Sequence, residues 1–186
     1  SSSAASDVYK RQTLAHSNPT MLTITPTITP IPAYTDNYIW LIQQHNQAVC
    51  IDPGEAAPVL EYLHAHGLTL AQIWITHAHA DHTAGIAELT QHFSGCPVYG
   101  AEDIPQATRI VREGDSIAWQ NHRARVWHTA GHTARHRCYL LNNQHLFTGD
   151  TLFAAGCGRV FPDSRPQWLY HSLQRIFRLP DATRLY

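Results

Sequence analysis

The chain has 186 residues and a formal net charge of −1 with its histidines neutral. This balance gives no indication of binding to nucleic acid or to an anionic membrane, and no apolar run reaches the ~18–20 residues of a membrane span. The four cysteines show no CxxC spacing and no secretory signal is evident, so we expect free thiols and a cytoplasmic location.

The first 20 residues differ in composition from the rest of the chain. They open with a serine-rich stretch, contain the only lysine, Lys10, and are followed by the only methionine, Met21. We therefore expect residues 1–20 to be a non-native or disordered leader that takes no part in the fold. Residues 21–186 are enough for one domain with its own core.

The first half of the domain is predicted to alternate strands with helices. Threonine and proline alternate with apolar residues between 21 and 32, which is typical of an edge strand. His45-Asn46 separates two strand-like runs and indicates a hairpin. Gly67 is a stop signal for the helix before it, and apolar residues recur with helical spacing in the next helix. The predicted elements are strands at 21–32, 37–44, 47–52 and 70–76 and helices at 55–66 and 81–93.

The second half is predicted to consist mainly of hairpins followed by a helix that begins with proline. The apolar face of this helix is expected to consist of Leu169, Leu173, Ile176 and Phe177. The predicted elements are strands at 96–99, 115–119, 123–128, 137–141, 145–148 and 183–186 and a helix at 166–179, with 101–114 unassigned. Antiparallel runs of strands with helices inserted between them indicate the α+β class, with sheets in the middle and helices outside.

The stretch from Thr76 to His82 contains four side chains able to bind a metal. Because residues i and i+2 of an extended segment point to the same side, His77 and His79 can hold one ion together. Asp81 and His82, at the turn into the next helix, face another direction and can hold a second ion nearby. Imidazole and carboxylate groups suit zinc, iron and similar metals. In a chain with 14 histidines, a polar loop without metal is the alternative.

Two later motifs can complete such a site. Gly131 lets the backbone turn after a strand, so that His132 can point back as the third nitrogen ligand of the first ion. Asp150 follows a strand end and a glycine, and its two carboxylate oxygens can bridge two ions; an Asx turn or helix cap is the alternative. His128 and His136 are expected either to support the ligands from behind or to lie on the surface.

A glycine-rich loop at 155–161 follows these motifs. Arg159 offers a forked donor that suits a carboxylate. Phe161 offers an apolar wall next to it. We therefore expect both residues to contact a substrate.

The order of these motifs resembles the hydroxyacylglutathione hydrolase (glyoxalase II) branch of the metallo-β-lactamase superfamily. The motifs are THAHADH at 76–82, GHT at 131–133, GDTLF at 149–153 and GCGR at 156–159. The segments PIPAYTDNYIW at 30–40 and DPGEA at 52–56 also match this family closely. The similarity runs from Met21 to Tyr186, so the resemblance implies that residues 21–186 form a metallo-β-lactamase-like catalytic domain.

The resemblance implies a four-layer αββα sandwich with a two-metal site at one edge. Position by position, it implies that the first ion is held by His77, His79 and His132, the second by Asp81 and His82, and both by Asp150. We expect both ions to be zinc, with iron and manganese as alternatives. No catalytic side chain is expected beyond these ligands.

The sequence also departs from the family pattern. The family has one more histidine ligand just beyond a strand like the one at 183–186, and a C-terminal helical domain that grips glutathione. Neither is found in these 186 residues, so we expect the sequence to be truncated before the C-terminal helical domain. Arg135 stands where the family usually has glycine.

The reaction implied by the resemblance is hydrolysis of S-D-lactoylglutathione to D-lactate and glutathione, a step of methylglyoxal detoxification. A metal-activated water would attack the thioester carbonyl. Arg159 would meet a carboxylate of glutathione, and Phe161 would pack alongside. We expect a monomer whose only partner is the glutathione thioester. The alternatives are a persulfide dioxygenase of the same fold, with one iron held by two histidines and an aspartate, and an inactive fragment.

Overall fold

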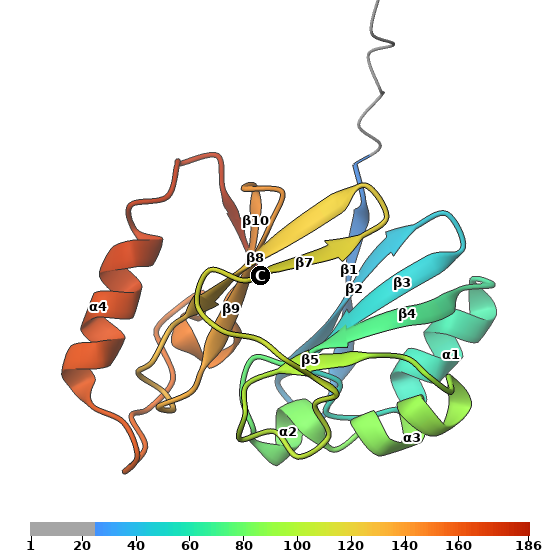
Figure 1. Ribbon diagram of the computed structural model, residues 1–186, viewed down its shortest axis with the longest axis horizontal. Coiled ribbons are helices and arrows are strands. Elements are labelled where there is room, and N and C mark those ends of the chain that lie inside the picture. Colours follow the sequence, from blue (N-terminus) through green and yellow to red (C-terminus); the bar gives the residue numbers. More distant parts are fainter. Residues whose placement is uncertain (1–24) are drawn as a thin grey trace, which may run out of the picture.

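Two β-sheets pack face to face, and helices cover the outer face of each (Figure 1). The computed structural model describes residues 25–186, so the predicted leader at 1–20 lies outside the described residues. Within this range, no helix has both the length and the apolar composition needed to cross a membrane. The architecture is the four-layer α+β sandwich that the sequence predicts.

The larger sheet has six strands in the order β1-β2-β3-β4-β5-β6. Their bounds are Thr27–Ala33 (β1), Asn37–Gln44 (β2), Gln47–Ile51 (β3), Thr69–Trp74 (β4), Val98–Gly100 (β5) and Arg109–Ile110 (β6). The hairpin predicted around His45-Asn46 is confirmed, because β2 and β3 pair antiparallel on either side of it. β1 lies at the edge, where Pro30 and Pro32 are tolerated since an edge strand needs fewer ladder donors.

The smaller sheet has five strands in the order β11-β10-β9-β8-β7. Their bounds are Ser116–Trp119 (β7), His122–His128 (β8), Arg137–Leu141 (β9), His145–Phe147 (β10) and Arg184–Leu185 (β11). Both predicted hairpins of the second half are confirmed. Asn142 and Asn143 lie in the second turn with φ of 51° and 56°, a left-handed conformation that asparagine adopts more readily than most residues.

The expectation of antiparallel runs is only partly correct. The pairs β3–β4, β4–β5, β5–β6 and β10–β11 are parallel. Helices lie in the connections between several of these strands, and a crossover of this kind returns the chain to the same end of the sheet, so that the next strand runs in the same direction. Both sheets are therefore mixed, and the ends of several strands meet at one edge.

Three apolar layers hold the four structural layers together. The helices are α1 (Ala57–Ala65), α2 (Ala80–Thr83), α3 (Ile86–His92) and α4 (Pro166–Ile176). Val59 and Leu63 of α1 and Leu89 of α3 pack on the larger sheet. Trp74 and Tyr139 lie in the core between the sheets, with ring centroids 5.5 Å apart. A third cluster, which includes Trp127 and Ile176, joins the smaller sheet to α4.

The single helix predicted at 81–93 is instead two short helices, α2 and α3, and this prediction is wrong. The break lies at Gly85, whose N–H donates to the carbonyl of Pro53 at 2.9 Å. A Cβ at this position would lie 2.7 Å from the backbone of Pro53, Glu55 and Ala56. The turn after β3 therefore packs directly against Gly85. This long-range contact cannot be seen in the helical spacing of the apolar residues.

Replacing Gly85 with alanine is expected to destabilise the fold by about 2–4 kcal/mol, because backbone atoms cannot move aside as a flexible side chain would. The exposed neighbour Ala84 provides the matched control, and Ala84→Ser should change the free energy of unfolding by less than ~0.5 kcal/mol. Urea unfolding measures both variants. Equal stability of the two would contradict the close packing at Gly85.

The last helix is shorter than predicted and its apolar face is narrower. α4 ends at Ile176, and Phe177 is 64% exposed, so its assignment to the apolar face is wrong. The helix is tied to the smaller sheet by Arg175, whose guanidinium lies 3.9 Å above the ring of Trp127 and donates two hydrogen bonds to Glu113. These contacts bring the helix against the loop that carries His132.

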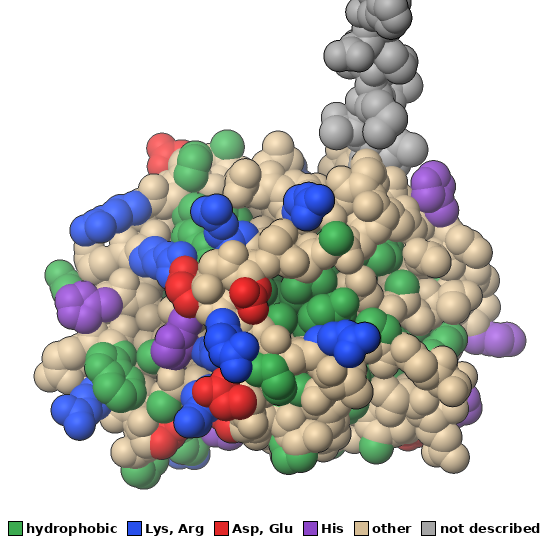
Figure 2. Space-filling view, viewed as in Figure 1, with side chains coloured by type: hydrophobic (Ala, Val, Ile, Leu, Met, Phe, Trp, Pro, Cys, Tyr) green, Lys and Arg blue, Asp and Glu red, His purple; other side chains and the backbone are tan. Residues whose placement is uncertain are grey.

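Charged side chains of both signs are interspersed on the face shown in Figure 2. The ion pairs of the described residues include Arg175 with Glu113 at 2.8 Å and Arg135 with Glu102 at 3.0 Å. Arg135, the position where the resembled family has glycine, is thus a half-exposed residue in a surface ion pair. Exposed pairs of this kind contribute only about 0–1 kcal/mol each.

Candidate metal centre

Four connections that follow strands meet at one edge of the sandwich. They are the turn after β3, the loop from β4 into α2, the loop after β8 and the short 3-10 turn Gly149–Thr151 after β10. Hydrogen bonds join them directly, including one from the N–H of Arg137 to the carbonyl of Thr76 at 2.8 Å. The edge therefore collects side chains that lie far apart in the sequence.

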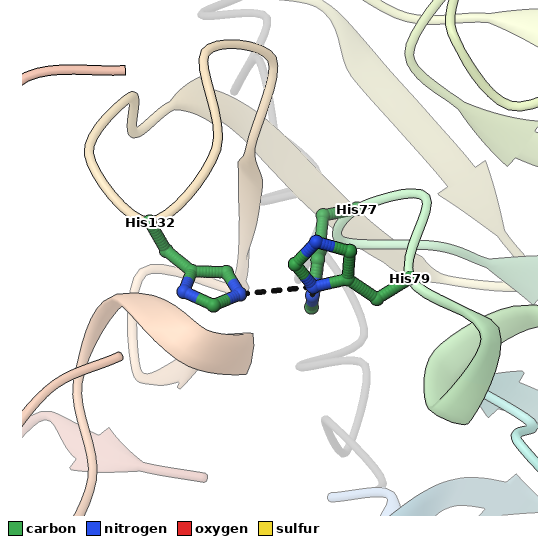
Figure 3. A group of neighbouring side chains, drawn as sticks. All are labelled: His77, His79 and His132. Carbon is green, nitrogen blue, oxygen red and sulfur yellow. Dashed lines mark hydrogen bonds between the residues drawn. The ribbon is translucent and has the colours of Figure 1, made fainter. Parts of the chain in front are cut away.

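His77, His79 and His132 converge from two of these loops (Figure 3). Nε2 of His77 and Nε2 of His132 lie 2.9 Å and 3.1 Å from Nδ1 of His79. Ligands held ~2.0–2.1 Å from a tetrahedral ion are separated by about 3.3 Å, so the spacing of these nitrogens fits one ion. The structure thus brings together the three residues that the sequence assigns to the first ion.

His82, Asp81 and Asp150 form a second group beside the first. Nε2 of His82 lies 3.5 Å from Oδ2 of Asp81 and 3.3 Å from Oδ1 of Asp150. The other carboxylate oxygen of Asp150 lies 3.3 Å from Nε2 of His132. Asp150 therefore faces both groups, which is the geometry that a shared carboxylate ligand needs.

Three of the four imidazoles have a hydrogen-bond acceptor behind Nδ1. Thr76 donates its hydroxyl to Oδ2 of Asp52 at 2.6 Å and therefore accepts from Nδ1–H of His77 at 3.0 Å. Nδ1–H of His132 donates to the carbonyl of Arg159 at 2.7 Å. Nδ1–H of His82 donates to Asp52 at 3.0 Å. On His77 and His132 the lone pair is left on Nε2, the atom that faces the centre, and on His82 it is left there once the second proton is lost. Such partners typically orient histidine ligands of metals.

The donor set fits a metal better than it fits an internal hydrogen-bond network. Nε2 of His82 is buried and makes no well-aligned hydrogen bond among residues 25–186, although carboxylate oxygens of Asp150 and Asp81 lie 3.3 Å and 3.5 Å away. The converging nitrogens of His77 and His132 both carry lone pairs, and a single proton on Nδ1 of His79 could satisfy only one of them well. A cation at this point would satisfy all of these atoms together, so the residues present are suited to divalent metal ions.

The environment keeps His77 and His79 neutral. Burial, reinforced by the neighbouring imidazoles, lowers the pKa of His77 far below its usual range. Burial and His132 lower the pKa of His79 as well. Because neutral imidazole is the form that binds metals, these two residues need to lose no proton before they bind an ion.

His82 has the opposite electrostatic environment. Burial lowers its pKa, but the carboxylates of Asp52 and Asp150 outweigh that effect and raise the pKa to about 10. The two carboxylates thus stabilise positive charge at this position. An ion bound here would take the place of the proton and interact with the same negative charges.

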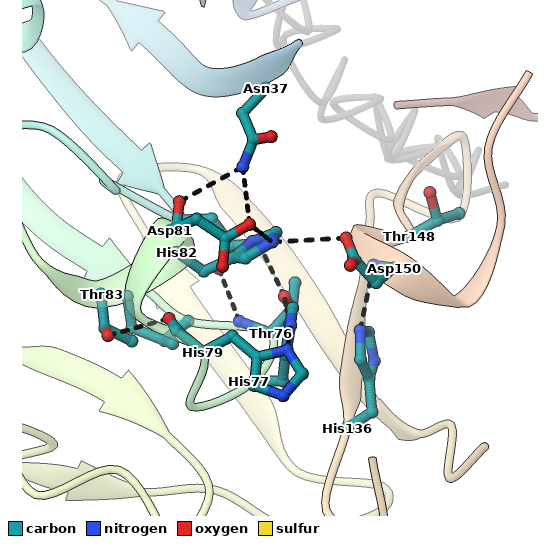
Figure 4. Close-up of polar contacts among 12 residues, drawn as sticks. Asn37, Thr76, His77, His79, Asp81, His82, Thr83, His136, Thr148 and Asp150 are labelled. Carbon is teal, nitrogen blue, oxygen red and sulfur yellow. Dashed lines mark hydrogen bonds and ion pairs between the residues drawn. The ribbon is translucent and has the colours of Figure 1, made fainter. Parts of the chain in front are cut away.

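Sequence reasoning missed two residues that hold the candidate ligands. The sequence places Asp52 only at the end of a predicted strand and in the segment at 52–56, yet it is buried and accepts hydrogen bonds from the N–H and the hydroxyl of Thr76 and from His82. Asn37 donates to Oδ2 of Asp81 at 3.0 Å (Figure 4). The one local signal is an aspartate directly after the apolar run at 48–51, where a buried carboxylate needs strong donors.

Arg159 and Phe161 lie beside the ligands, on the rim of a cavity of about 640 Å³ that also contacts His79, His132 and Asp150. The Phe161 ring centroid is 4.4 Å from that of His79, and the Arg159 guanidinium lies 4.4 Å from the Phe161 centroid. Arg159 is exposed, so its donors are free to meet a ligand in the cavity. The two residues are therefore placed where a substrate of a bound ion would lie.

His128 and His136 have different surroundings. His128 is exposed and its Nε2 lies 2.8 Å from the carbonyl of Ala134, outside the converging group. His136 is completely buried behind His77, with ring centroids 5.0 Å apart. The sequence left support and surface positions open for both, and the structure places His136 behind the ligands and His128 on the surface.

Gly158 is the residue of the glycine-rich loop that the site requires. A Cβ here would lie 2.5 Å from Nδ1 of His132 and would also collide with the carbonyl of Asp150. We expect Gly158→Ala to displace the His132 ring and the backbone of Asp150 and to lower zinc affinity by at least ~10-fold. Gly156→Ala, in the same loop but with nothing within 4 Å of its Cβ, is the matched control. Equal zinc affinities in a competition titration would contradict this packing.

Comparison with known proteins identifies the family. The model of the metallo-beta-lactamase superfamily matches residues 35–186. The chain belongs to the metallo-beta-lactamase superfamily. The resemblance drawn from the sequence motifs is thereby confirmed at the level of the superfamily, together with its fold.

Curated relatives confirm the closer resemblance to hydroxyacylglutathione hydrolases. Proteins of this name from Neisseria gonorrhoeae and Actinobacillus pleuropneumoniae are 51% and 44% identical over 162 and 160 residues. Each match covers 86% of this chain, but only 64% and 68% of those proteins. The chain thus spans less than two thirds of the length of the Neisseria relative.

Solved structures of the superfamily share the fold. ETHE1 from Myxococcus xanthus is 34% identical, with a TM-score of 0.76 over 86% of this chain and 74% of that chain. TTHA1623, solved in a di-iron-bound form, is 28% identical, with a TM-score of 0.72 over 85% of this chain and 90% of that chain. Both similarities cover the region that carries the candidate metal centre.

Proposed function

We propose that this domain is the catalytic part of a metal-dependent thioester hydrolase that converts S-D-lactoylglutathione to D-lactate and glutathione. The observation that carries this proposal is the convergence of three imidazoles and a shared aspartate at one strand edge, beside a cavity with an arginine and a phenylalanine. The names of the similar curated proteins support the same substrate class.

The ligands divide into two sets that share Asp150. One ion would be held by His77, His79 and His132, and the second by Asp81 and His82. Zinc is the first expectation, because imidazole and carboxylate ligands suit it, and iron or manganese are alternatives. When bound, the ions would lower the pKa of a water molecule and polarise the thioester carbonyl.

The side chains around the cavity would bind and orient the substrate. Arg159 would pair with a carboxylate of glutathione, and Phe161, held against the rings of His79 and His132, would cover the apolar part of the substrate. Asp52 and Thr76 would keep His77 and His82 in the tautomers that leave Nε2 free. The site would thus be rigid before substrate arrives.

The thiol leaving group needs little catalytic assistance from the protein. A cysteine-type thiol has a pKa of about 8.5, so glutathione can depart as a thiolate without a strong general acid. The reaction would therefore depend mainly on the ligands and on substrate orientation.

Hydrolysis of S-D-lactoylglutathione, followed by the release of free thiol, tests the proposal in protein purified with and without added zinc. We expect zinc-dependent turnover that a chelator abolishes and renewed zinc restores. Turnover that is unchanged after complete removal of metal would overturn the proposal. Full metal occupancy without thioester hydrolysis would do so as well.

The alternative reaction is oxygenation of glutathione persulfide by a single iron held by two histidines and an aspartate. The 34% identity to ETHE1 from Myxococcus xanthus makes this comparison necessary. Oxygen uptake with glutathione persulfide, measured on the iron-loaded protein, separates the two reactions. We expect none, and uptake faster than thioester hydrolysis would favour the alternative.

We also propose that the protein is a monomer in the cytoplasm. The four cysteines, all within residues 25–186, form no disulfide there, as is typical of a reducing compartment. Light scattering after size-exclusion chromatography is expected to give the mass of one chain. A mass of two chains would contradict the monomer.

A further inference from the structure

His136 lies between the two halves of the candidate centre. Its side chain is completely buried, with its ring nearly parallel to that of His77, at 23°, and a centroid distance of 5.0 Å. On its other side is the turn Gly149–Thr151, which carries Asp150 (Figure 4). His77 follows the larger sheet and Asp150 the smaller one, so His136 contacts the ends of both sheets.

The hydrogen bonds of His136 define its tautomer. The backbone N–H of Asp150 donates to Nε2 at 3.2 Å, so Nε2 carries the lone pair. The proton is therefore on Nδ1, which lies 3.0 Å from the hydroxyl of Thr129 and 3.2 Å from that of Thr151. Both ring nitrogens thus have partners, and the ring orientation is fixed.

The turn that carries Asp150 is packed directly against this ring. A Cβ at Gly149 would lie 2.9 Å from Nε2 of His136 and 2.5 Å from the hydroxyl oxygen of Thr76. Gly149 also has a φ of +47°, which glycine adopts readily. The backbone at 149–150 therefore packs closely against the side chains of His136 and Thr76.

We propose that His136 is a positioning residue that fixes the Asp150 carboxylate between the two groups of ligands. It binds no ion itself. By accepting the Asp150 N–H, it sets the turn so that the two carboxylate oxygens each lie 3.3 Å from an imidazole nitrogen, one on His82 and one on His132. The inference rests on the proposed metal centre and deepens it, because it names a residue on which a shared ligand depends.

Two substitutions of similar polarity separate this role from simple space filling. In His136→Gln, the side-chain amide reaches the position of Nε2 and its oxygen can accept the Asp150 N–H. In His136→Asn, the shorter amide reaches only the position of Nδ1, so it can still donate to Thr129 but leaves the Asp150 N–H unpaired. Both variants lose the imidazole ring and its contact with His77.

Zinc affinity of the wild type and of both variants is measured by competition with a chromophoric chelator, together with thermal unfolding of the metal-free forms. We expect His136→Asn to bind zinc ~10–100-fold more weakly than the wild type, as is common for residues that orient ligands, and His136→Gln to stay close to the wild type. Equal zinc affinities of the two variants would overturn the proposal. So would a loss in His136→Gln as large as that in His136→Asn.

A second measurement needs no variant and no metal. Long-range ¹H–¹⁵N spectra of the imidazole groups in the metal-free protein report which ring nitrogen carries the proton. We expect the Nδ1–H tautomer for His136, and an Nε2–H tautomer would overturn the proposal even if either variant failed to fold. If the wild type binds no zinc, the proposed function fails on that result alone, while the tautomer still tests the position of His136.

Discussion

His77→Ala is expected to lose most of the bound metal and to lower the rate of thioester hydrolysis by orders of magnitude. His77 lies in both groups of potential ligands, one with His79 and His132 and the other with His82 and Asp150. Its Nε2 carries the free lone pair because Nδ1–H is held by Thr76. Removing it takes a neutral, buried and preorganised nitrogen from the middle of the centre.

Metal content by elemental analysis and the rate of thiol release measure this effect. His64→Ala, which removes an exposed histidine from α1, is the control for a general loss of imidazole and should keep both quantities at wild-type levels. Full metal content and full rate in His77→Ala would show that the central motif does not have the role assigned to it.

Asp52→Asn is expected to have the second-largest effect, although Asp52 contacts no substrate. The carboxylate accepts three hydrogen bonds, from the N–H and hydroxyl of Thr76 and from Nδ1–H of His82. An amide has only one acceptor oxygen, so its NH₂ would face a donor. His82 could respond by moving its proton to Nε2, which would remove the lone pair that faces the centre.

The consequences for stability and for metal binding are separable. We expect the free energy of unfolding of the metal-free protein to fall by about 1–3 kcal/mol, the cost of leaving a buried donor unpaired. Zinc affinity should fall by ~10–100-fold. Asp181→Asn, at an exposed position, should change neither quantity. Urea unfolding and zinc titration check the two effects, and a variant with wild-type zinc affinity would contradict the assigned tautomer of His82.

The local patterns of the sequence predicted much of the fold correctly. Strand periodicity and turn residues located β2, β3 and the hairpins of the smaller sheet to within about one residue, because these features depend on neighbours in the chain. The alternation of His77 and His79 likewise predicted that both would face one side, and they do. Whether they bind an ion remains a prediction.

Contacts between segments that are distant in the sequence could not be predicted from these local patterns. The break at Gly85, the parallel pairing of β3 with β4 and the burial of Asp52 all depend on which segments meet in space. The exposure of Phe177 depends on α4 ending at Ile176, three residues before the predicted end at 179, which helical spacing alone does not define. The proximity of Asp150 to His82 and His132 was available from the family resemblance, and the structure adds how the backbone holds it.

Zinc titration of the metal-free protein by isothermal calorimetry, with the same titration of His132→Ala, tests the central claim most directly. His132 comes from the other sheet, so its contribution cannot follow from the 76–82 motif alone. The account predicts tight zinc binding by the wild type and a loss of at least ~100-fold in affinity for the variant. Absence of zinc binding in a folded wild type, or equal affinity in both proteins, would contradict a metal centre built from the ends of both sheets.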